Sequence, residues 1–148
     1  MEMRTILFLP RKGLAEDILS PRARDILAGI GEVVWNERDR DYTPDELADL
    51  LPGADAVITS WGSPAFTPAL LEVADRLKIV GHAAGSVKHL MPKAGYDRGI
   101  VVLSAAAVIA EAVAEYTVGA MLSMQRQLFP YHRHLTEARG WKGEPGLP

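Results

Sequence analysis

Five short apolar runs constrain the fold of this chain more than any other feature. They are rich in β-branched residues and cover Thr5–Leu9, Val33–Trp35, Ala56–Thr59, Leu77–Gly81 and Ile100–Leu103. The runs lack the strict inside–outside alternation of a strand with one wet face. Strands that are apolar on both faces are typical of a parallel sheet covered by helices. The sequence therefore predicts an α/β protein.

Three helix starts lie between these runs at nearly equal intervals. Each is a hydroxyl residue able to cap a helix, followed by proline at the first helical position. They are Ser20-Pro21, Thr43-Pro44 and Thr67-Pro68, which lie 23 and 24 residues apart. Thr43 and Glu46 also have the spacing of a capping box. This alternation predicts right-handed crossovers and a flavodoxin-like, doubly wound parallel sheet in the order 2-1-3-4-5.

A long alanine-rich stretch follows the fifth run. Val108–Leu128 predicts a single helix, which Phe129-Pro130 should end, and Tyr131–Arg139 predicts a second one. The apolar part is long enough to span a membrane, but it contains Glu111 and Glu115, and carboxylates are costly there. We expect a helix that is buried between domains or in an interface.

Composition argues against several classes of function. The 148 residues carry 16 Lys and Arg against 19 Asp and Glu, a net charge of -3, so no electrostatic footprint for nucleic acid or a membrane surface is visible. Cysteine is absent from the sequence, which removes disulfides, thiol nucleophiles and thiolate metal sites. The first apolar run is too short for the core of a signal peptide. We expect a cytoplasmic protein without nucleic-acid or membrane partners.

No metal site is predicted from the sequence. His132 and His134 are two residues apart, which places them on different faces of a helix. Glu111 and Glu115 share a helical face but have no histidine partner. We expect solvated histidines, and a Glu115 that accepts a hydrogen bond in an interdomain contact.

Two loops after the predicted strands are candidates for ligand binding, because ligands of open parallel sheets bind at the carboxyl ends of the strands. Ala83–Val87 is nearly bare of side chains, so its consecutive main-chain N–H groups can cradle an anion, with Lys88 and His89 at the rim. The alternative is a plain glycine turn packed under a helix. The loop Ser60–Pro64 offers an aromatic wall beside another glycine. His82, at the end of the fourth run, is either a satisfied core histidine or a substrate contact.

Three stretches together resemble the NAD-dependent D-2-hydroxyacid dehydrogenases, a family that includes phosphoglycerate, glycerate and formate dehydrogenases. They are Leu77–Val87 (LKIVGHAAGSV), Arg98–Val102 (RGIVV) and Val113–Thr117 (VAEYT). The resemblance implies a flavodoxin-like substrate domain, here residues 1–103, interrupted by a Rossmann domain that holds NAD. Residues 104–148 would then be the interdomain helix and the start of that NAD-binding domain. We expect a homodimer.

The activity that the resemblance implies is hydride transfer between NAD or NADP and a small D-2-hydroxy acid, or its 2-keto acid. The substrate carboxylate would be held by the main chain around Gly85 and Ser86, and the substrate site as a whole would comprise Trp61, Gly62, His82, Ala84, Gly85 and Ser86. Gly85 would also touch the nicotinamide or its ribose. The family's G-x-G-x-x-G turn, its arginine and its histidine–glutamate pair are not found in this sequence. We therefore expect a fragment that binds no cofactor and is inactive by itself.

The sequence departs from the family pattern at the cradle. Family members commonly read G-R-x-G-x-G-x-D-N, whereas this chain has His82 for arginine, Ala84 and Ser86 for two glycines, and Lys88-His89 for aspartate and asparagine. These changes leave the particular acid open, including a phosphorylated one. The Ser86 hydroxyl either donates to the acid or caps the next turn.

A noncatalytic role is the alternative: a freestanding flavodoxin-like binding or dimerisation module. A phosphoacceptor receiver would need acidic residues after the first and third strands, but Leu9-Pro10 and Thr59-Ser60 stand there. A flavodoxin would need a hydroxyl-rich loop after the first strand, which PRKGLA lacks. Dimerisation through the apolar face of Val108–Leu128 stays open and is compatible with the enzyme.

Overall fold

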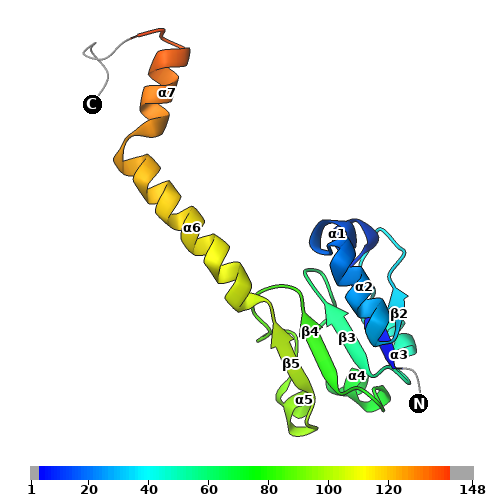
Figure 1. Ribbon diagram of the computed structural model, residues 1–148. Helices are drawn as coiled ribbons and strands as arrows, with labels where there is room; N and C mark the ends of the chain where they lie inside the picture. Colours follow the sequence, from blue (N-terminus) through cyan, green and yellow to red (C-terminus); the bar gives the residue numbers. More distant parts are fainter. Residues whose placement is uncertain (1–3, 141–148) are drawn as a thin grey trace. The chain divides into compact units, whose positions relative to one another are not determined.

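A single parallel sheet organises the first part of the chain (Figure 1). The computed structural model describes residues 4–140, which divide into two compact units on either side of the Ala107–Val108 bond. The strands of the first unit are β1 (Thr5–Phe8), β2 (Glu32–Trp35), β3 (Ala56–Thr59), β4 (Ile79–His82) and β5 (Val101–Ser104). They pair in parallel in the order β2-β1-β3-β4-β5. The predicted fold class and strand order are confirmed.

Helices begin at all three of the predicted caps. The helices of the first unit that connect its strands are α1 (Lys12–Ile18), α2 (Pro21–Ile30), α3 (Pro44–Leu50), α4 (Pro68–Val73) and α5 (Lys93–Asp97). Ser20, Thr43 and Thr67 each accept a main-chain N–H in the first turn of α2, α3 and α4. The Glu46 carboxylate accepts the Thr43 N–H at 2.9 Å, which completes the predicted capping box.

The hydrophobic core lies on one face of this sheet. Alternate strand residues such as Leu7, Val57 and Val80 pack there with Leu47 of α3 and Leu70 of α4, and all are buried. Full burial of an aliphatic side chain of this size is worth about 1.5–3 kcal/mol relative to exposure. This core holds β1, β3 and β4 in register and so fixes where their carboxyl ends lie.

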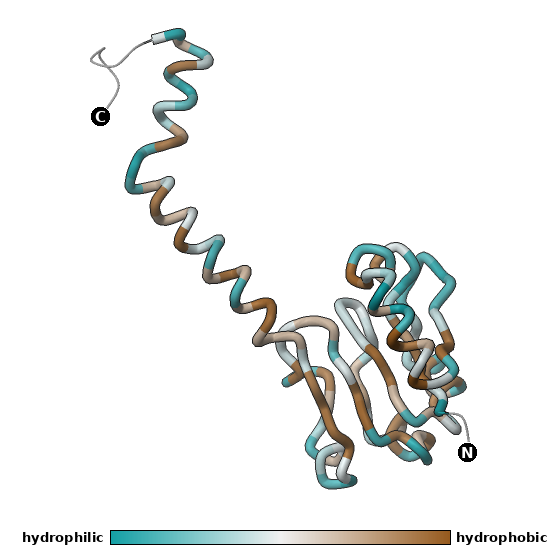
Figure 2. The backbone as a smooth tube through the Cα atoms, viewed as in Figure 1, coloured by the Kyte–Doolittle hydropathy of each residue, from teal (hydrophilic) through white to brown (hydrophobic). Residues whose placement is uncertain are grey.

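The opposite face of the sheet is covered only in part. Figure 1 shows α1 and α2 on this side, over the part of the sheet near β1 and β2. Ile79 of β4 and Val101 and Leu103 of β5 are 36%, 51% and 55% exposed. Figure 2 shows these strands as predominantly hydrophobic. Because parallel sheets are normally covered on both faces, this apolar surface is unusual for a finished α/β domain.

The second unit consists mainly of two helices, α6 (Ala106–Gln125), which begins at the end of the first unit, and α7 (Leu128–Thr136). The predicted break at Phe129-Pro130 is wrong, because α6 ends at Gln125 and Gln127 adopts a left-handed conformation with φ of 53°. Pro130 lies in the first turn of α7, where the missing N–H of proline breaks no intrahelical bond.

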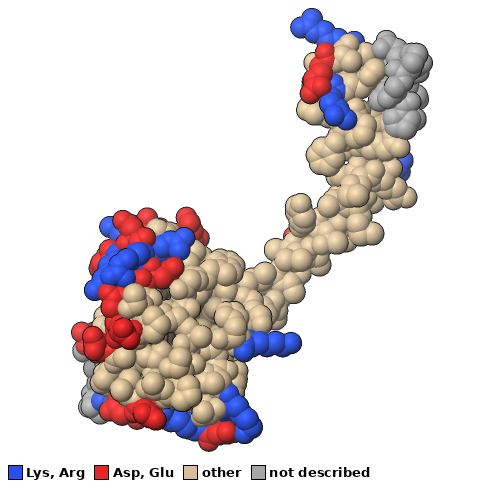
Figure 3. Space-filling view, turned by 180° about the vertical axis from the view of Figure 1, so that it is seen from behind, with Lys and Arg blue, Asp and Glu red and all other residues tan. Residues whose placement is uncertain are grey.

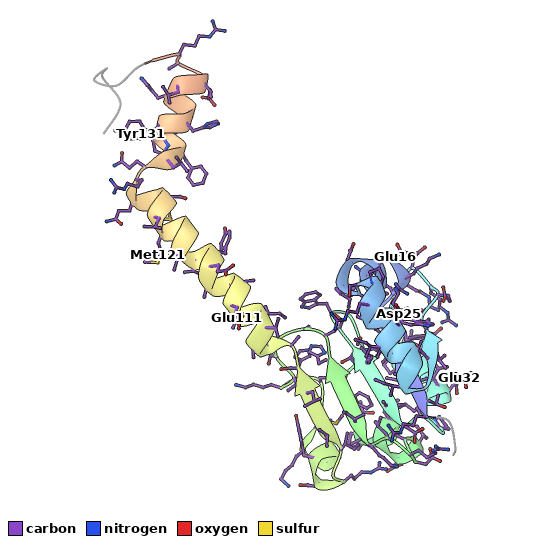
Figure 4. All side chains as sticks on the ribbon, in the orientation of Figure 1. Glu16, Asp25, Glu32, Glu111, Met121 and Tyr131 are labelled. Atoms are coloured by element: carbon purple, nitrogen blue, oxygen red, sulfur yellow. The ribbon has the colours of Figure 1, made fainter. Side chains whose placement is uncertain are left out.

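Helix α6 is predominantly apolar, with Glu111 and Glu115 as its charged residues, and none of its residues is buried. Among the described residues it is the one helix long and apolar enough to cross a membrane, by length and composition only. Few charges appear along it in Figure 3, and Glu111 and Met121 project from it in Figure 4. Apolar helices in soluble proteins also pass this test, so the property does not separate a membrane span from an interface.

Candidate functional site

The carboxyl ends of β3, β4 and β5 place three polar residues in one row. Thr59 is the register partner of His82, and His82 is in turn the partner of Ser104. Thr59 and His82 follow Val57 and Val80 by two residues, so their side chains lie on the core face of the sheet. Thr59 Oγ1 and His82 Nδ1 are 2.8 Å apart, and both residues are buried. The sheet thus positions His82 through its neighbouring strand.

The surroundings of His82 keep its imidazole neutral. Burial lowers the pKa of His82, and the nearby His89 lowers it further. The two rings meet edge to face with their centroids 6.2 Å apart. The Nδ1 atom of His82 forms a hydrogen bond with Thr59. Its Nε2 atom has no hydrogen-bond partner within residues 4–140, and it is not among the buried side-chain atoms that lack one. His82 is therefore a satisfied core histidine at one nitrogen and is open to a ligand at the other.

The loop after β4 exposes a series of unpaired main-chain donors. The Ala83 N–H donates to the Thr59 carbonyl oxygen at 2.8 Å. The next four N–H groups, from Ala84 to Val87, donate to no acceptor within residues 4–140. Ala84 is buried, Gly85 and Val87 are half-buried and Ser86 is exposed, so these N–H groups belong to a loop at the surface of the first unit. Such a series suits an anion. We call residues 84–87 the amide cradle.

Glycine at position 85 is not required by its own surroundings. Gly85 has no left-handed φ, and a Cβ atom built on it would meet no described atom within 4 Å. Neither backbone geometry nor packing within the described chain accounts for this glycine. Gly85 leaves the main chain of the amide cradle uncovered and accessible to a ligand.

The rim of the amide cradle is polar and exposed. The Ser86 hydroxyl accepts the Lys88 N–H at 3.4 Å, so it helps to close the turn while its own proton stays available to a ligand. Lys88 and His89 are exposed beside it. Both of the roles considered for Ser86 are thus compatible with its position.

A second loop, residues 60–64 after β3, is tied to the first. Ser60 Oγ donates to the Ala83 carbonyl oxygen at 3.1 Å, and Ser63 Oγ accepts the Ser60 N–H at 3.0 Å. Trp61 is 59% exposed, so its ring is available as a wall. From the sequence, Ser60 is only the first residue of this loop and no role is predicted for it, although its place directly after β3 could have indicated one.

Gly62 has a structural explanation within the chain. Its φ is 84°, and a Cβ atom on it would lie 2.1 Å from Asp41 Oδ2. Asp41 in turn pairs with Arg11 across 3.6 Å. No pattern in the sequence indicates the contact with Asp41, because the two residues lie far apart along the chain. Gly62 shapes the second loop through its conformation.

Metal-binding side chains do not converge in the described part of the chain. Within residues 4–140 there is no group of three or more His, Cys, Asp or Glu side chains that could hold an ion. His132 and His134 both lie on α7, and neither belongs to such a group. The groups that the candidate site presents are main-chain donors, a hydroxyl and an imidazole, which can bind and orient an acid.

Comparison with known proteins places nearly the whole chain in one group. Residues 14–139 match the family model of the D-isomer specific 2-hydroxyacid dehydrogenase catalytic domain. The D-3-phosphoglycerate dehydrogenase of Methanocaldococcus jannaschii is 32% identical over 117 residues, which cover 79% of this chain and 22% of that protein.

Solved structures share the fold. A phosphoglycerate oxidoreductase from Rhizobium etli superposes with a TM-score of 0.70 at 24% identity, over 98% of this chain and 44% of that one. An acyclic imino acid reductase, solved in complex with NADPH and D-Arg, gives a TM-score of 0.72 at 17% identity, over 97% and 44%. The chain thus spans less than half the length of each of these relatives.

Proposed function

Because this chain belongs to the D-isomer specific 2-hydroxyacid dehydrogenase family, we propose that it is the substrate-binding part of an NAD(P)-dependent oxidoreductase that acts on a small D-2-hydroxy acid or its 2-keto acid. The amide cradle carries this proposal, because it presents four unpaired N–H groups at the carboxyl end of β4. Such donors match the carboxylate, the anionic group that all these acids share.

The residues of this chain bind and orient the acid. The amide cradle holds the carboxylate through charge-assisted hydrogen bonds, and the Ser86 hydroxyl adds a donor. Trp61 and Gly62 shape the space for the substrate side chain, and His82 lies beside Ala84 at the start of the loop. Fixing the acid in this way supplies proximity and orientation for the reaction at C2.

NAD or NADP supplies or accepts the hydride when it is bound. The open space around Gly85 fits close approach of the nicotinamide end to the main chain. The 148 residues contain no G-x-G-x-x-G turn for the pyrophosphate. We propose that the chain by itself neither binds NAD(P) tightly nor transfers hydride.

Kinetics of the longest protein encoded by the reading frame test this function. We expect NADH- or NADPH-dependent reduction of a 2-keto acid, and Gly85→Val should lower kcat/KM by about tenfold or more, about 1.4 kcal/mol, because the side chain blocks the amide cradle. Gly13→Val is the matched control, since Gly13 also has open space around it but lies in α1. Equal losses in both variants, or none at Gly85, would contradict the role of the amide cradle.

Fluorescence of NADH tests the cofactor part separately. The 148-residue chain should leave NADH emission unchanged at micromolar protein. Tight binding of NADH would show that the chain holds a nucleotide site that its sequence does not reveal.

The exposure of α6 favours a second, compatible role. Apolar side chains such as Val113, Tyr116 and Met121 are 55%, 78% and 64% exposed. We propose that the protein is a cytoplasmic homodimer and that α6 contributes to its interface. A dimerisation module without catalysis would share this property but would not need the amide cradle.

A further inference from the structure

We propose that His82, His89 and Lys88 form a second anion subsite beside the amide cradle, which takes the second acidic group of a dicarboxylic or phosphorylated 2-hydroxy acid. The inference rests on the proposed function, since the amide cradle must hold the first carboxylate. It goes further by assigning the substrate to the class of acids with two anionic groups.

The geometry brings the two imidazoles to the same loop as the amide cradle. His82 precedes the amide cradle and His89 follows it, yet their ring centroids are only 6.2 Å apart. The loop therefore turns back on itself, and the four unpaired N–H groups lie on the segment between the two rings. Both imidazoles therefore lie within a few residues of the amide cradle, one on each side of it in the sequence.

His82 is held in a fixed orientation. Its residue exposure is 5%, and its Nδ1 lies 2.8 Å from Thr59 Oγ1. Packing and this bond leave Nε2 as the atom that can reach a ligand. A buried side chain with one satisfied and one open nitrogen is a pre-positioned contact, unlike an exposed histidine that must lose rotamer freedom on binding.

The charges around this loop favour an anion. Residues 82–89 include Lys88 and two histidines but no Asp or Glu. Within residues 4–140, neither Lys88 nor His89 forms an ion pair with a carboxylate. The residues that face His82 from the neighbouring strands are Thr59 and Ser104, which are neutral.

Protonation should couple to binding. Burial and then the closeness of His89 lower the pKa of His82, so its protonated form is disfavoured without a ligand. An anion beside the His82 ring opposes both effects and favours protonation of His82. Because binding then takes up a proton at His82, the subsite should bind a second anionic group better at about pH 6 than at about pH 8.

Binding of three acids to the 148-residue chain, measured by NMR titration, tests the proposal. D-Lactate has one acidic group, D-malate adds a carboxylate and D-3-phosphoglycerate adds a phosphate. At about pH 6 at least one of the two larger acids should bind about tenfold more tightly than D-lactate, and this ratio should shrink at about pH 8. A gain for D-malate alone identifies a carboxylate subsite, and a gain for D-3-phosphoglycerate alone identifies a phosphate subsite.

Exposed substitutions supply the controls. Lys88→Gln and His89→Gln should each reduce the ratio without unfolding the chain, whereas His132→Gln on α7 should leave it unchanged. If D-lactate binds and the larger acids bind no more tightly, the second subsite is wrong and the proposed function stands. If none of the three acids binds, the proposed function itself fails.

Discussion

Gly53 and Gly62 both have left-handed backbones, and comparing their substitutions distinguishes the free energy lost through backbone strain from that lost through a steric contact. Gly53 has φ of 77° and open space where a Cβ would lie, whereas Gly62 has φ of 84° and the Asp41 carboxylate in that space. Gly53→Ala should therefore destabilise the fold by about 1–2 kcal/mol through conformation alone. Gly62→Ala should destabilise the fold slightly more, because the Asp41 carboxylate must swing away from the new methyl group. Urea unfolding measures both, and equal losses would show that Asp41 is not held against Gly62.

His82 should make folding stability depend on pH. Its pKa in the folded protein is lowered, so the unfolded chain binds the proton more readily. The stability is therefore full above the ordinary histidine pKa of about 6.5 and declines as the pH falls below it. Thermal unfolding between about pH 8 and pH 5 should show a smaller loss of Tm for His82→Gln than for the unchanged protein. Parallel curves for the two proteins would exclude His82 as the cause.

The start of α3 is the best-specified helix terminus in the first unit. Thr43 accepts the Glu46 N–H at 3.3 Å, and Glu46 accepts the Thr43 N–H at 2.9 Å and also pairs with Arg40. Thr43→Ala should lower the free energy of unfolding by about 1 kcal/mol, and Thr43→Ser should retain it. Denaturant midpoints at constant m-value give the comparison. A destabilised serine variant would contradict capping as the role of Thr43.

The elements that the sequence predicted are those with local chemical signals. Hydroxyl–proline pairs predict where α2, α3 and α4 begin, because both the capping side chain and the proline act within the first turn of the helix. Helix α1 has no such signal, since Arg11 precedes it without a side-chain cap bond. The end of α6 was misplaced because proline was interpreted as a helix breaker, whereas here it lies in the first turn of the next helix.

The geometry of the candidate site could be predicted only in part for a similar reason. The loop around Gly85 could be proposed from the sequence because bare residues after a strand leave the main chain accessible, and its role in binding stays a prediction. The bond between Thr59 and His82 could not, because it depends on the register of two strands 23 residues apart. The contact between Gly62 and Asp41 likewise arises only from the tertiary fold.

At the scale of the whole molecule, exposed apolar surface should govern association. Helix α6 is predominantly apolar and exposed, as Leu122 at 56% illustrates. Light scattering of the chain should report dimers or larger species, and Leu122→Glu should shift them toward monomer by placing a charge on the apolar surface. Gln125→Glu adds the same charge at an already polar position and should have little effect. A monomer at high concentration would contradict the assignment of α6 to an interface.

The most direct test of the central claim is a titration of the 15N-labelled chain with a 2-hydroxy acid such as D-lactate, followed through its main-chain amide signals. The amides of Ala84, Gly85, Ser86 and Val87 should shift together and saturably, because they are the unpaired donors that receive the carboxylate. In the same titration of Gly85→Val, the amide signals of residues 84–87 should not shift. Unchanged signals at these four residues in the unaltered chain, or saturable shifts confined to another surface, would contradict the claim that this loop binds the acid.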